Sequence, residues 1–260
     1  MELTFEKWHG TGNDFVMVLD PGGRWQPGQA VIRQICERRT GVGADGLILI
    51  QEDETEDFRM IYFNSDGRES SMCGNGGRCA IAFAAKHGLG RDSVRFRAID
   101  GVHEGRAEAD GRISLRMIDV RHHTRHGADF VLDTGSPHYV RFTSLDAHPD
   151  FQKEAAAIRH HPDFAKQGIN VNFVEEPGPG LLSMRTYERG VEAETLSCGT
   201  GAVAAALAAA RRHEKTGMQR FEINTRGGRL NVKFRADADA FRDIWLTGPA
   251  RYVFSGSLPV

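Results

Sequence analysis

The sequence lacks several features that would point to whole classes of protein. Its 260 residues contain no apolar run of eighteen, so no segment is long enough for a membrane-spanning helix. Basic and acidic residues nearly balance, at 33 against 35, for a net charge of −2, so there is no excess of positive charge to attract nucleic acid or an anionic membrane. The N-terminus MELTFEKWHG lacks the basic and apolar regions of a signal peptide. We therefore expect a cytoplasmic protein that acts on a small molecule, without nucleic-acid or membrane partners.

Cysteine is also scarce, with four residues at no scaffold-like spacing, and in a cytoplasmic protein these should be reduced thiols. No Cys-x-x-Cys pair is present, so we expect no metal, and the histidine-rich segment 121–126 is interpreted as a solvated basic loop. No pyridoxal-phosphate or dinucleotide-binding motif occurs either, which predicts a protein without a cofactor. Cys36 and Cys79 have apolar helical neighbours and are interpreted as core residues.

Glycine, by contrast, is abundant at 30 residues, and it separates segments of regular pattern. Apolar spacing predicts a helix from residue 29 that is capped near Gly41, and another that ends at Gly88. A third helix is predicted over 151–164. A strand broken by a turn or bulge is predicted at 4–20, and a hairpin about Gly227 and Gly228 is predicted at 221–235.

The order of motifs in the first half repeats in the second half. TGNDFV at Thr11 corresponds to TGSPHYV at Thr134, an offset of 134 − 11 = 123, and CGNGGRCAIAFAA at Cys73 corresponds to CGTGAVAAALAAA at Cys198, an offset of 198 − 73 = 125. Two distant motifs with nearly equal offsets indicate a duplicated α+β unit. We expect pseudo-symmetric domains over 1–121, joined by the last strand at 250–260, and over 122–249. Each should be a mostly antiparallel sheet or barrel around a central helix, with the active site in the cleft between them.

Each Cys-Gly-x-Gly segment precedes an alanine-rich helical run, so its thiol should lie at a helix N-terminus. Unpaired backbone N–H groups and the helix dipole favour a thiolate there, and the glycines let a ligand carboxylate approach these amides. A buried cysteine at an ordinary glycine-rich helix start is the alternative for either copy taken alone. Two thiols facing one ligand suit inversion at a carbon bearing hydrogen, in which one thiolate removes a proton and the other thiol delivers one.

With these motifs, the sequence resembles the diaminopimelate epimerases. The resemblance runs along essentially the whole chain, in the order HGTGNDFV, TGVGADGL, FNSDG, MCGNGGRC, GSPHYV, INVNF, YERGVEAET and SCGTGAVA. It implies interconversion of LL- and meso-2,6-diaminopimelate in lysine and cell-wall synthesis, without cofactor or metal, by an enzyme that is usually a homodimer.

The resemblance also implies residue roles. Cys73 and Cys198 would be the acid–base pair, and His138 and Glu188 would tune the thiols. The substrate-binding residues would be Asn13, Asn64, Gly74, Asn75, Asn170, Glu188, Arg189, Gly199 and Thr200.

The sequence departs from the family pattern at three places. Ser136 stands where the family often has asparagine, Gly46 stands where many members have glutamine, and the segment between Arg189 and Cys198 is one residue longer than the common form. The first two departures weaken the assignment of residues to the distal end of the substrate.

Two other functions remain open on the sequence. A proline or hydroxyproline racemase of the same fold would also use two facing cysteines. A non-catalytic ligand-binding or redox-sensing protein could use Cys73 and Cys198 as a disulfide.

Overall fold

The chain folds into two compact units. The computed structural model describes residues 2–90 and 93–259. Unit 1 extends to Leu115 and resumes at Gly248, and unit 2 spans Arg116–Thr247.

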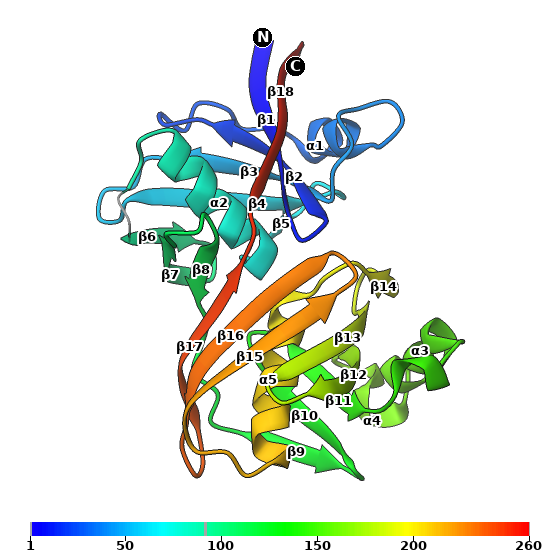
Figure 1. The fold of residues 1–260 in the computed structure, drawn as a ribbon. Coiled ribbons are helices and arrows are strands. Elements are labelled where there is room, and N and C mark those ends of the chain that lie inside the picture. Colours follow the sequence, from blue (N-terminus) through cyan, green and yellow to red (C-terminus); the bar gives the residue numbers. More distant parts are fainter. Residues whose placement is uncertain (1, 91–92, 260) are drawn as a thin grey trace. The chain divides into compact units, whose positions relative to one another are not determined.

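Unit 1 consists mostly of strands, with two helices (Figure 1). Its elements are β1 (Glu2–Gly10), β2 (Asn13–Leu19), α1 (Gln29–Cys36), β3 (Gly46–Gln51), β4 (Phe58–Asn64), β5 (Glu69–Ser70), α2 (Gly74–Lys86), β6 (Ser93–Ala98), β7 (Gly101–Ala107), β8 (Ile113–Arg116) and β18 (Arg251–Pro259).

Unit 2 has the same kind of composition (Figure 1). Its elements are β9 (His123–His126), β10 (Asp129–Asp133), β11 (Pro137–Phe142), the 3-10 helix η1 (Leu145–Ala147), α3 (Phe151–Arg159), α4 (Pro162–Ala165), β12 (Asn170–Gly178), β13 (Leu181–Glu188), β14 (Ala193–Thr195), α5 (Gly199–Arg212), β15 (Gly217–Thr225), β16 (Gly228–Ala236) and β17 (Phe241–Gly248).

The strand pairings of unit 1 recur in unit 2 in the same order and direction. In unit 1, β1–β2, β3–β4 and β6–β7 are antiparallel, and β2–β3 and β4–β6 are parallel. In unit 2, β10–β11, β12–β13 and β15–β16 are antiparallel, and β11–β12 and β13–β15 are parallel. The α+β class and the internal duplication are therefore confirmed.

Each unit encloses one helix, α2 or α5. Residues 201–210 of α5 are all buried, so strands cover this helix on every side, and its many alanines let those strands approach closely. A helix that is apolar all round is typical of such a position. The first residues of α2 and α5 are thereby held within the strands of their own units.

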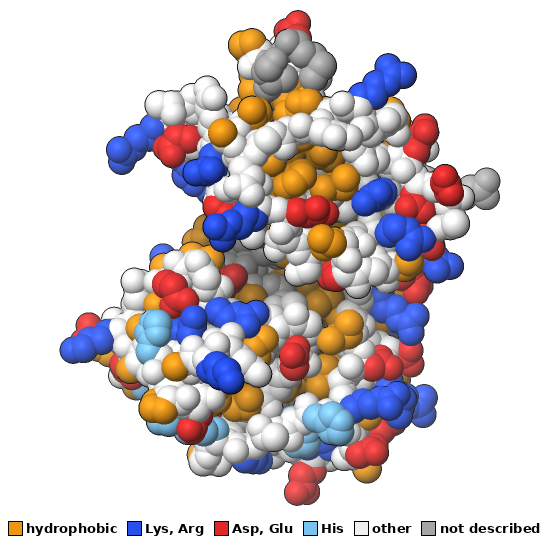
Figure 2. Space-filling model, turned by 180° about the vertical axis from the view of Figure 1, so that it is seen from behind, with side chains coloured by type: hydrophobic (Ala, Val, Ile, Leu, Met, Phe, Trp, Pro, Cys, Tyr) orange, Lys and Arg blue, Asp and Glu red, His pale blue; other side chains and the backbone are white. Residues whose placement is uncertain are grey.

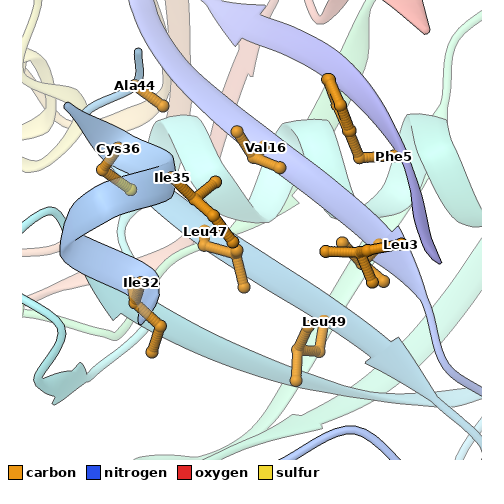
Figure 3. Close-up of a cluster of buried hydrophobic side chains, with 10 residues drawn as sticks. Leu3, Phe5, Val16, Ile32, Ile35, Cys36, Ala44, Leu47 and Leu49 are labelled. Carbon is orange, nitrogen blue, oxygen red and sulfur yellow. The ribbon is translucent and has the colours of Figure 1, made fainter. Parts of the chain in front are cut away.

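A second helix covers the other face of the sheet in each unit. In unit 1, Ile32, Ile35 and Cys36 of α1 pack against Leu47 and Leu49 of β3 (Figure 3). In unit 2, Phe151 of α3 packs with ring centroids 5.1 Å from Phe173 of β12. Side chains alternate between the faces of a strand, so the intervening residues of β3 and β12 point toward the enclosed helix.

Three local predictions were wrong. Helix α1 ends at Cys36 rather than near Gly41, because the backbone N–H groups of Val42 and Ala44 take the last carbonyls of the helix. The predicted helix over 151–164 is divided into α3 and α4, because Pro162 has no N–H to continue the first helix.

The third error concerns the segment expected to be a solvated loop at 121–126. Its residues from His123 onward form β9, which pairs antiparallel with β10.

The chain returns to unit 1 at its end. Strand β18 pairs antiparallel with β1, with Glu2 opposite Pro259, so the first and last strands lie side by side (Figure 1). The predicted return of the last strand to the first domain is thus confirmed.

Charged side chains of both signs are mixed over the face in Figure 2 rather than gathered in a patch of one sign. Across the described residues, no helix is both long and apolar enough to span a membrane.

Candidate active site

Cys73 is the N-cap of α2, where the sequence predicts a thiol. Its backbone is extended, with φ −99° and ψ 147°, and its sulfur accepts a hydrogen bond from the Gly76 N–H at 3.2 Å. A backbone N–H at a helix start favours a negatively charged acceptor. This contact therefore stabilises the thiolate form of Cys73.

Two predicted substrate-binding amides lie beside Cys73. Asn13 Oδ1 is 4.0 Å from the sulfur and accepts a hydrogen bond from Asn75 Nδ2 at 3.3 Å. Asn13 Nδ2 in turn donates to the Asp45 carboxylate at 2.6 Å. Asp45 therefore fixes the orientation of Asn13, which the sequence alone did not indicate.

Asn64, at the end of β4, is partly buried and lies opposite Gly46 of β3. A Cβ atom at Gly46 would lie 2.4 Å from the Phe63 carbonyl and 2.6 Å from the Tyr62 ring. The departure at position 46 therefore has a packing reason, because the neighbours of Gly46 leave no room for a side chain.

The guanidinium of Arg78 lies behind the first turn of α2 and is fully buried. It donates to Asn75 Oδ1 at 2.8 Å and to the Gly74 carbonyl at 3.1 Å. Gly10 permits this approach, because a Cβ atom there would lie 3.2 Å from Arg78 Nη2. Arg78 was not among the site residues predicted from the sequence, although it lies within the MCGNGGRC motif.

Cys198 caps α5 as Cys73 caps α2, but its surroundings differ. Its sulfur is 3.4 Å from Thr200 Oγ1, and no side-chain capping bond from Cys198 is formed. A Cβ atom at Gly201 would lie 2.6 Å from Asn172 Oδ1, so this glycine is required for the close approach of α5 to β12. The Thr134 hydroxyl donates to the Thr200 carbonyl at 2.8 Å, which ties the turn before β11 to the helix start.

His138 reaches Cys198 through Thr200. Its Nε2 is 2.9 Å from Thr200 Oγ1, and its Nδ1 is 3.1 Å from Asn172 Nδ2. Complete burial, together with the positive charge of Arg189, lowers the pKa of His138 to about 3. His138 is therefore neutral at physiological pH and acts on Cys198 through a hydrogen-bonded hydroxyl.

The remaining predicted binding residues of unit 2 form a second cluster. Asn170 Oδ1 accepts from the Arg189 backbone N–H at 2.9 Å. Ser136 Oγ accepts from Asn170 Nδ2 at 2.8 Å and from Arg189 Nη2 at 3.3 Å. Ser136 is thus part of this cluster, although its short side chain had weakened the prediction at this position.

Glu188 ends β13, and its carboxylate accepts a hydrogen bond from the Thr195 hydroxyl. Val171 of β12 lies opposite Tyr187 of the antiparallel strand β13, so Asn170 and Glu188 occupy the next pair of opposed positions. Gly46 and Asn64 occupy the equivalent positions in unit 1.

The structure thus joins Asn13 and Asn75 to Cys73, and Thr200 and His138 to Cys198. Asn170 and Arg189 form a separate hydrogen-bonded group with Ser136.

The other two thiols belong to the core. Cys36 and Cys79 are buried; burial raises the pKa of Cys36 to about 11 and that of Cys79 still further. Both interpretations as packing residues are confirmed.

One group in the described part of the chain has ligand atoms close enough for a metal ion, namely His126, His161 and Asp163. His126 Nε2 is 3.0 Å from Asp163 Oδ2. His161 and Asp163 are exposed. None of the three is a predicted site residue.

Comparison with known proteins identifies the family. The diaminopimelate epimerase family profile matches residues 5–122 and 130–253. A diaminopimelate epimerase from Flavobacterium psychrophilum is 45% identical over 97% of this chain and 98% of its own. One from Chlorobaculum tepidum is 42% identical over 96% of this chain and 98% of its own.

Solved structures with the same fold are more distant in sequence. A phenazine biosynthesis protein of the PhzF family from Bacillus anthracis has a TM-score of 0.79 at 16% identity, with full coverage of both chains. A hydroxyproline epimerase from Agrobacterium vitis, with bound trans-4-hydroxy-L-proline, has a TM-score of 0.69 at 15% identity, covering 99% of this chain and 92% of that chain. These likenesses establish the fold, and the full-length sequence relatives establish that the chain belongs to the diaminopimelate epimerase family.

Proposed function

We propose that this protein interconverts LL- and meso-2,6-diaminopimelate, in lysine and peptidoglycan precursor synthesis, with Cys73 and Cys198 as the acid–base pair. The observation that carries the proposal is the repeated placement of a cysteine at the N-cap of the enclosed helix in both halves of a duplicated fold. A duplicated unit supplies two similar groups, and inversion at one carbon requires one group on each face of that carbon.

In the proposed reaction, the two sulfurs act on the same substrate carbon. One thiolate takes the α-proton and becomes a thiol, and the C–H electron pair remains on the substrate as a carbanion. The opposite thiol then donates its proton to the other face and becomes a thiolate. Backbone N–H groups at the starts of α2 and α5, from Gly74, Asn75, Gly199 and Thr200, would hold the reacting carboxylate and stabilise its developing negative charge.

The rest of the substrate carries two ammonium groups and a second carboxylate. Arg189, which Ser136 and the Gln167 carbonyl hold in place, is suited to the distal carboxylate because a guanidinium can bind it bidentately. Asn13, Asn64, Asn170 and Glu188 supply acceptors for the ammonium groups. His138 would tune the Cys198 thiol through Thr200, and Glu188 would act as a second tuning group.

Hydrogen exchange tests the proposal directly. In deuterated water, wild-type protein should place deuterium on the reacting α-carbon of LL-diaminopimelate. Cys73→Ala and Cys198→Ala should each reduce epimerisation by about 10²-fold or more, as expected for loss of a positioned acid or base. Full epimerisation by either variant would rule out the two-thiol mechanism, and activity on L-proline or 4-hydroxyproline alone would rule out the proposed substrate.

A homodimer is a further part of the proposal. Strand β18 pairs with β1, and Tyr252, Val253 and Phe254 on it are 44–51% exposed. An exposed apolar edge strand is a template for pairing with a second copy. Sedimentation should find a dimer that Val253→Lys weakens; a monomeric wild type would contradict this part, and cell fractionation tests the predicted cytoplasmic location.

A further inference from the structure

Arg78 is a buried cation without an ion-pair partner within residues 2–90 and 93–259. Its hydrogen bonds end on neutral oxygens, those of the Asn75 amide, the Thr11 hydroxyl and the Gly74 and Pro249 carbonyls. A buried charge is costly unless an opposite charge compensates it. The positive end of α2 lies at the same place, so this region as a whole requires an anion.

Two thiols are close enough to interact electrostatically with Arg78, those of Cys73 and Cys79. Burial raises the pKa of Cys79 far above its usual value, so that thiol stays neutral. Although burial also lowers the pKa of Arg78, to about 10, the guanidinium remains charged at neutral pH. Cys73 is therefore the group within unit 1 that can supply the anion before substrate binds.

The second unit has no such cation at its helix start. The fifth residue after Cys73 is Arg78, whereas the fifth residue after Cys198 is Val203, which is buried within α5. The duplicated positions thus carry a charge in one unit and an apolar side chain in the other.

At two further pairs of equivalent positions, the two units carry different side chains. Where β4 ends in the neutral Asn64, β13 ends in the carboxylate Glu188. The β2 residue that pairs with Gly46 is Phe15, and the β11 residue that pairs with Asn170 is His138, which is neutral. Arg189 is a cation among the predicted site residues of unit 2, and its guanidinium donates to Ser136 and the Gln167 carbonyl.

Several other titratable groups on the strands around α2 form ion pairs or hydrogen bonds with residues other than Arg78 and Cys73. Glu6 is bound to Lys86, Lys7 to Asp14, and His103 to Asp100. His9 accepts the Gly12 N–H. Other charged groups on the strands that pack against α2 are Arg59, Glu104 and Arg106.

We propose that Arg78 supplies the fixed positive charge that makes Cys73 the thiolate and leaves Cys198 the thiol in the enzyme before substrate binds. Arg78 is a positioning residue, because it acts through Cys73 and through the first turn of α2. The catalytic consequence of this charge rests on the proposed function. Before substrate binds, the Cys73 thiolate is ready to remove a proton from the isomer whose α-hydrogen faces Cys73. The opposite isomer requires the proton to move from Cys198 to Cys73 first.

Alkylation of the wild-type protein tests this without any turnover. The rates at which iodoacetamide modifies Cys73 and Cys198 are measured against pH by mass spectrometry of the two peptides. The midpoint for Cys73 should lie at least about one pH unit below that for Cys198, since an opposite charge nearby lowers a thiol pKa by about 1–3 units. Equal midpoints, or a lower one for Cys198, would overturn the proposal.

Two substitutions separate charge from shape. Arg78→Met keeps much of the volume and removes the charge, so the Cys73 midpoint should rise by about one unit or more. Arg78→Lys keeps the charge but loses the planar geometry of the guanidinium, so the midpoint should remain near wild type. A shift of similar size in both variants would show a merely structural role, and the Cys198 midpoint should not change in either.

The outcomes are independent of the proposed function. Wild-type protein with separated midpoints but no epimerisation would overturn the function alone, whereas full epimerisation with equal midpoints would overturn the role of Arg78 alone. Circular dichroism checks that both variants fold. If Arg78→Met does not fold, the alkylation midpoints of the wild-type protein and of Arg78→Lys still test the role of Arg78.

Discussion

At the scale of single side chains, the two cysteines occupy the same helix position with different hydrogen-bond partners. Cys73 receives a backbone N–H from Gly76, whereas Cys198 lies against the Thr200 hydroxyl, which leads to His138. A backbone amide donates permanently, while a hydroxyl can either donate or accept. Cys198 can therefore exchange a proton with less change in its surroundings.

Removing the Thr200 hydroxyl should impair the reaction. Thr200→Val eliminates the link between His138 and Cys198, and kcat should fall about threefold to tenfold, the equivalent of one hydrogen bond of about 0.5–1.5 kcal/mol. Thr200→Ser keeps the hydroxyl and serves as the control. Steady-state kinetics in both directions measures the effect, and a Thr200→Val enzyme with the wild-type kcat would show that the link is unimportant.

Asp14 should make stability depend on pH in acid. Burial raises its pKa, but hydrogen bonds from Arg38 and Lys7 outweigh this and lower the pKa from 3.8 to about 2. A carboxyl with a lower pKa in the folded state stabilises the protein above pH 3.8, and this contribution is lost as the pH falls toward about 2. The loss should amount to about 2 kcal/mol.

Denaturant unfolding at several pH values measures this change. Asp14→Asn should weaken the dependence of stability on pH below pH 4, because the carboxyl that titrates there is absent. Asp66→Asn, at an exposed turn position, is the control and should leave the dependence unchanged. An Asp14→Asn variant with the full wild-type dependence would assign the effect to other groups.

At the scale of elements, the starts of α2 and α5 depend on close packing against strands. Gly201→Ala would place a Cβ atom 2.6 Å from Asn172 Oδ1, which forces α5 away from β12. Unfolding free energy should fall by about 1–3 kcal/mol, as for overpacking elsewhere. Since the same movement displaces Cys198, activity should fall as well.

Gly28→Ala is the matched control for this prediction. Gly28 is the N-cap of α1, has φ −71°, and would place no atom within 4 Å of a new Cβ. Alanine is a poorer N-cap than glycine, so the substitution should lower stability by about 0.5–1 kcal/mol, but it creates no clash and should leave activity unchanged. Similar losses for the two variants, measured by denaturant unfolding, would show that the contact with Asn172 is not the cause.

Sequence periodicity predicted the elements near the site better than their ends. The enclosed helices were predictable because alanine and small apolar residues follow each Cys-Gly-x-Gly segment without interruption. The end of α1 was not, because hydrogen bonds from Val42 and Ala44, in the loop that follows the helix, determine it. The strand β9 was missed because its side chains are polar and only pairing with β10 reveals it.

At the scale of the whole molecule, the duplication was the most informative sequence feature. Equal offsets between motifs predicted two similar units, and the recurring strand pairings confirm them. The contributions of Asp45 and Asn172 could not be predicted, because each acts through a partner from a distant element. The hydrogen bonds of Ser136 could not be predicted for the same reason, since its partners Asn170 and Arg189 come later in the chain. Arg78 was missed because its importance follows from its complete burial, which the sequence does not show.

The two-thiol proposal predicts a specific cross-link. If both sulfurs reach one substrate carbon, mild oxidation should join Cys73 to Cys198, abolish activity, and be reversed by reductant. Cys36 and Cys79 should remain unmodified because they are buried. Peptide mapping under non-reducing conditions measures the linkage, and a bridge between Cys36 and Cys79 instead would contradict the facing-thiol arrangement.

The pairing of β1 with β18 also has a consequence for synthesis of the chain. All of unit 2 has been translated once residue 247 has left the ribosome, whereas β1 of unit 1 must wait for residues 251–259 to complete its sheet. Domains generally fold as units during translation. We expect unit 2 to fold while β1 still lacks β18 beside it. The earliest part of the chain to be made is then among the last to be finished.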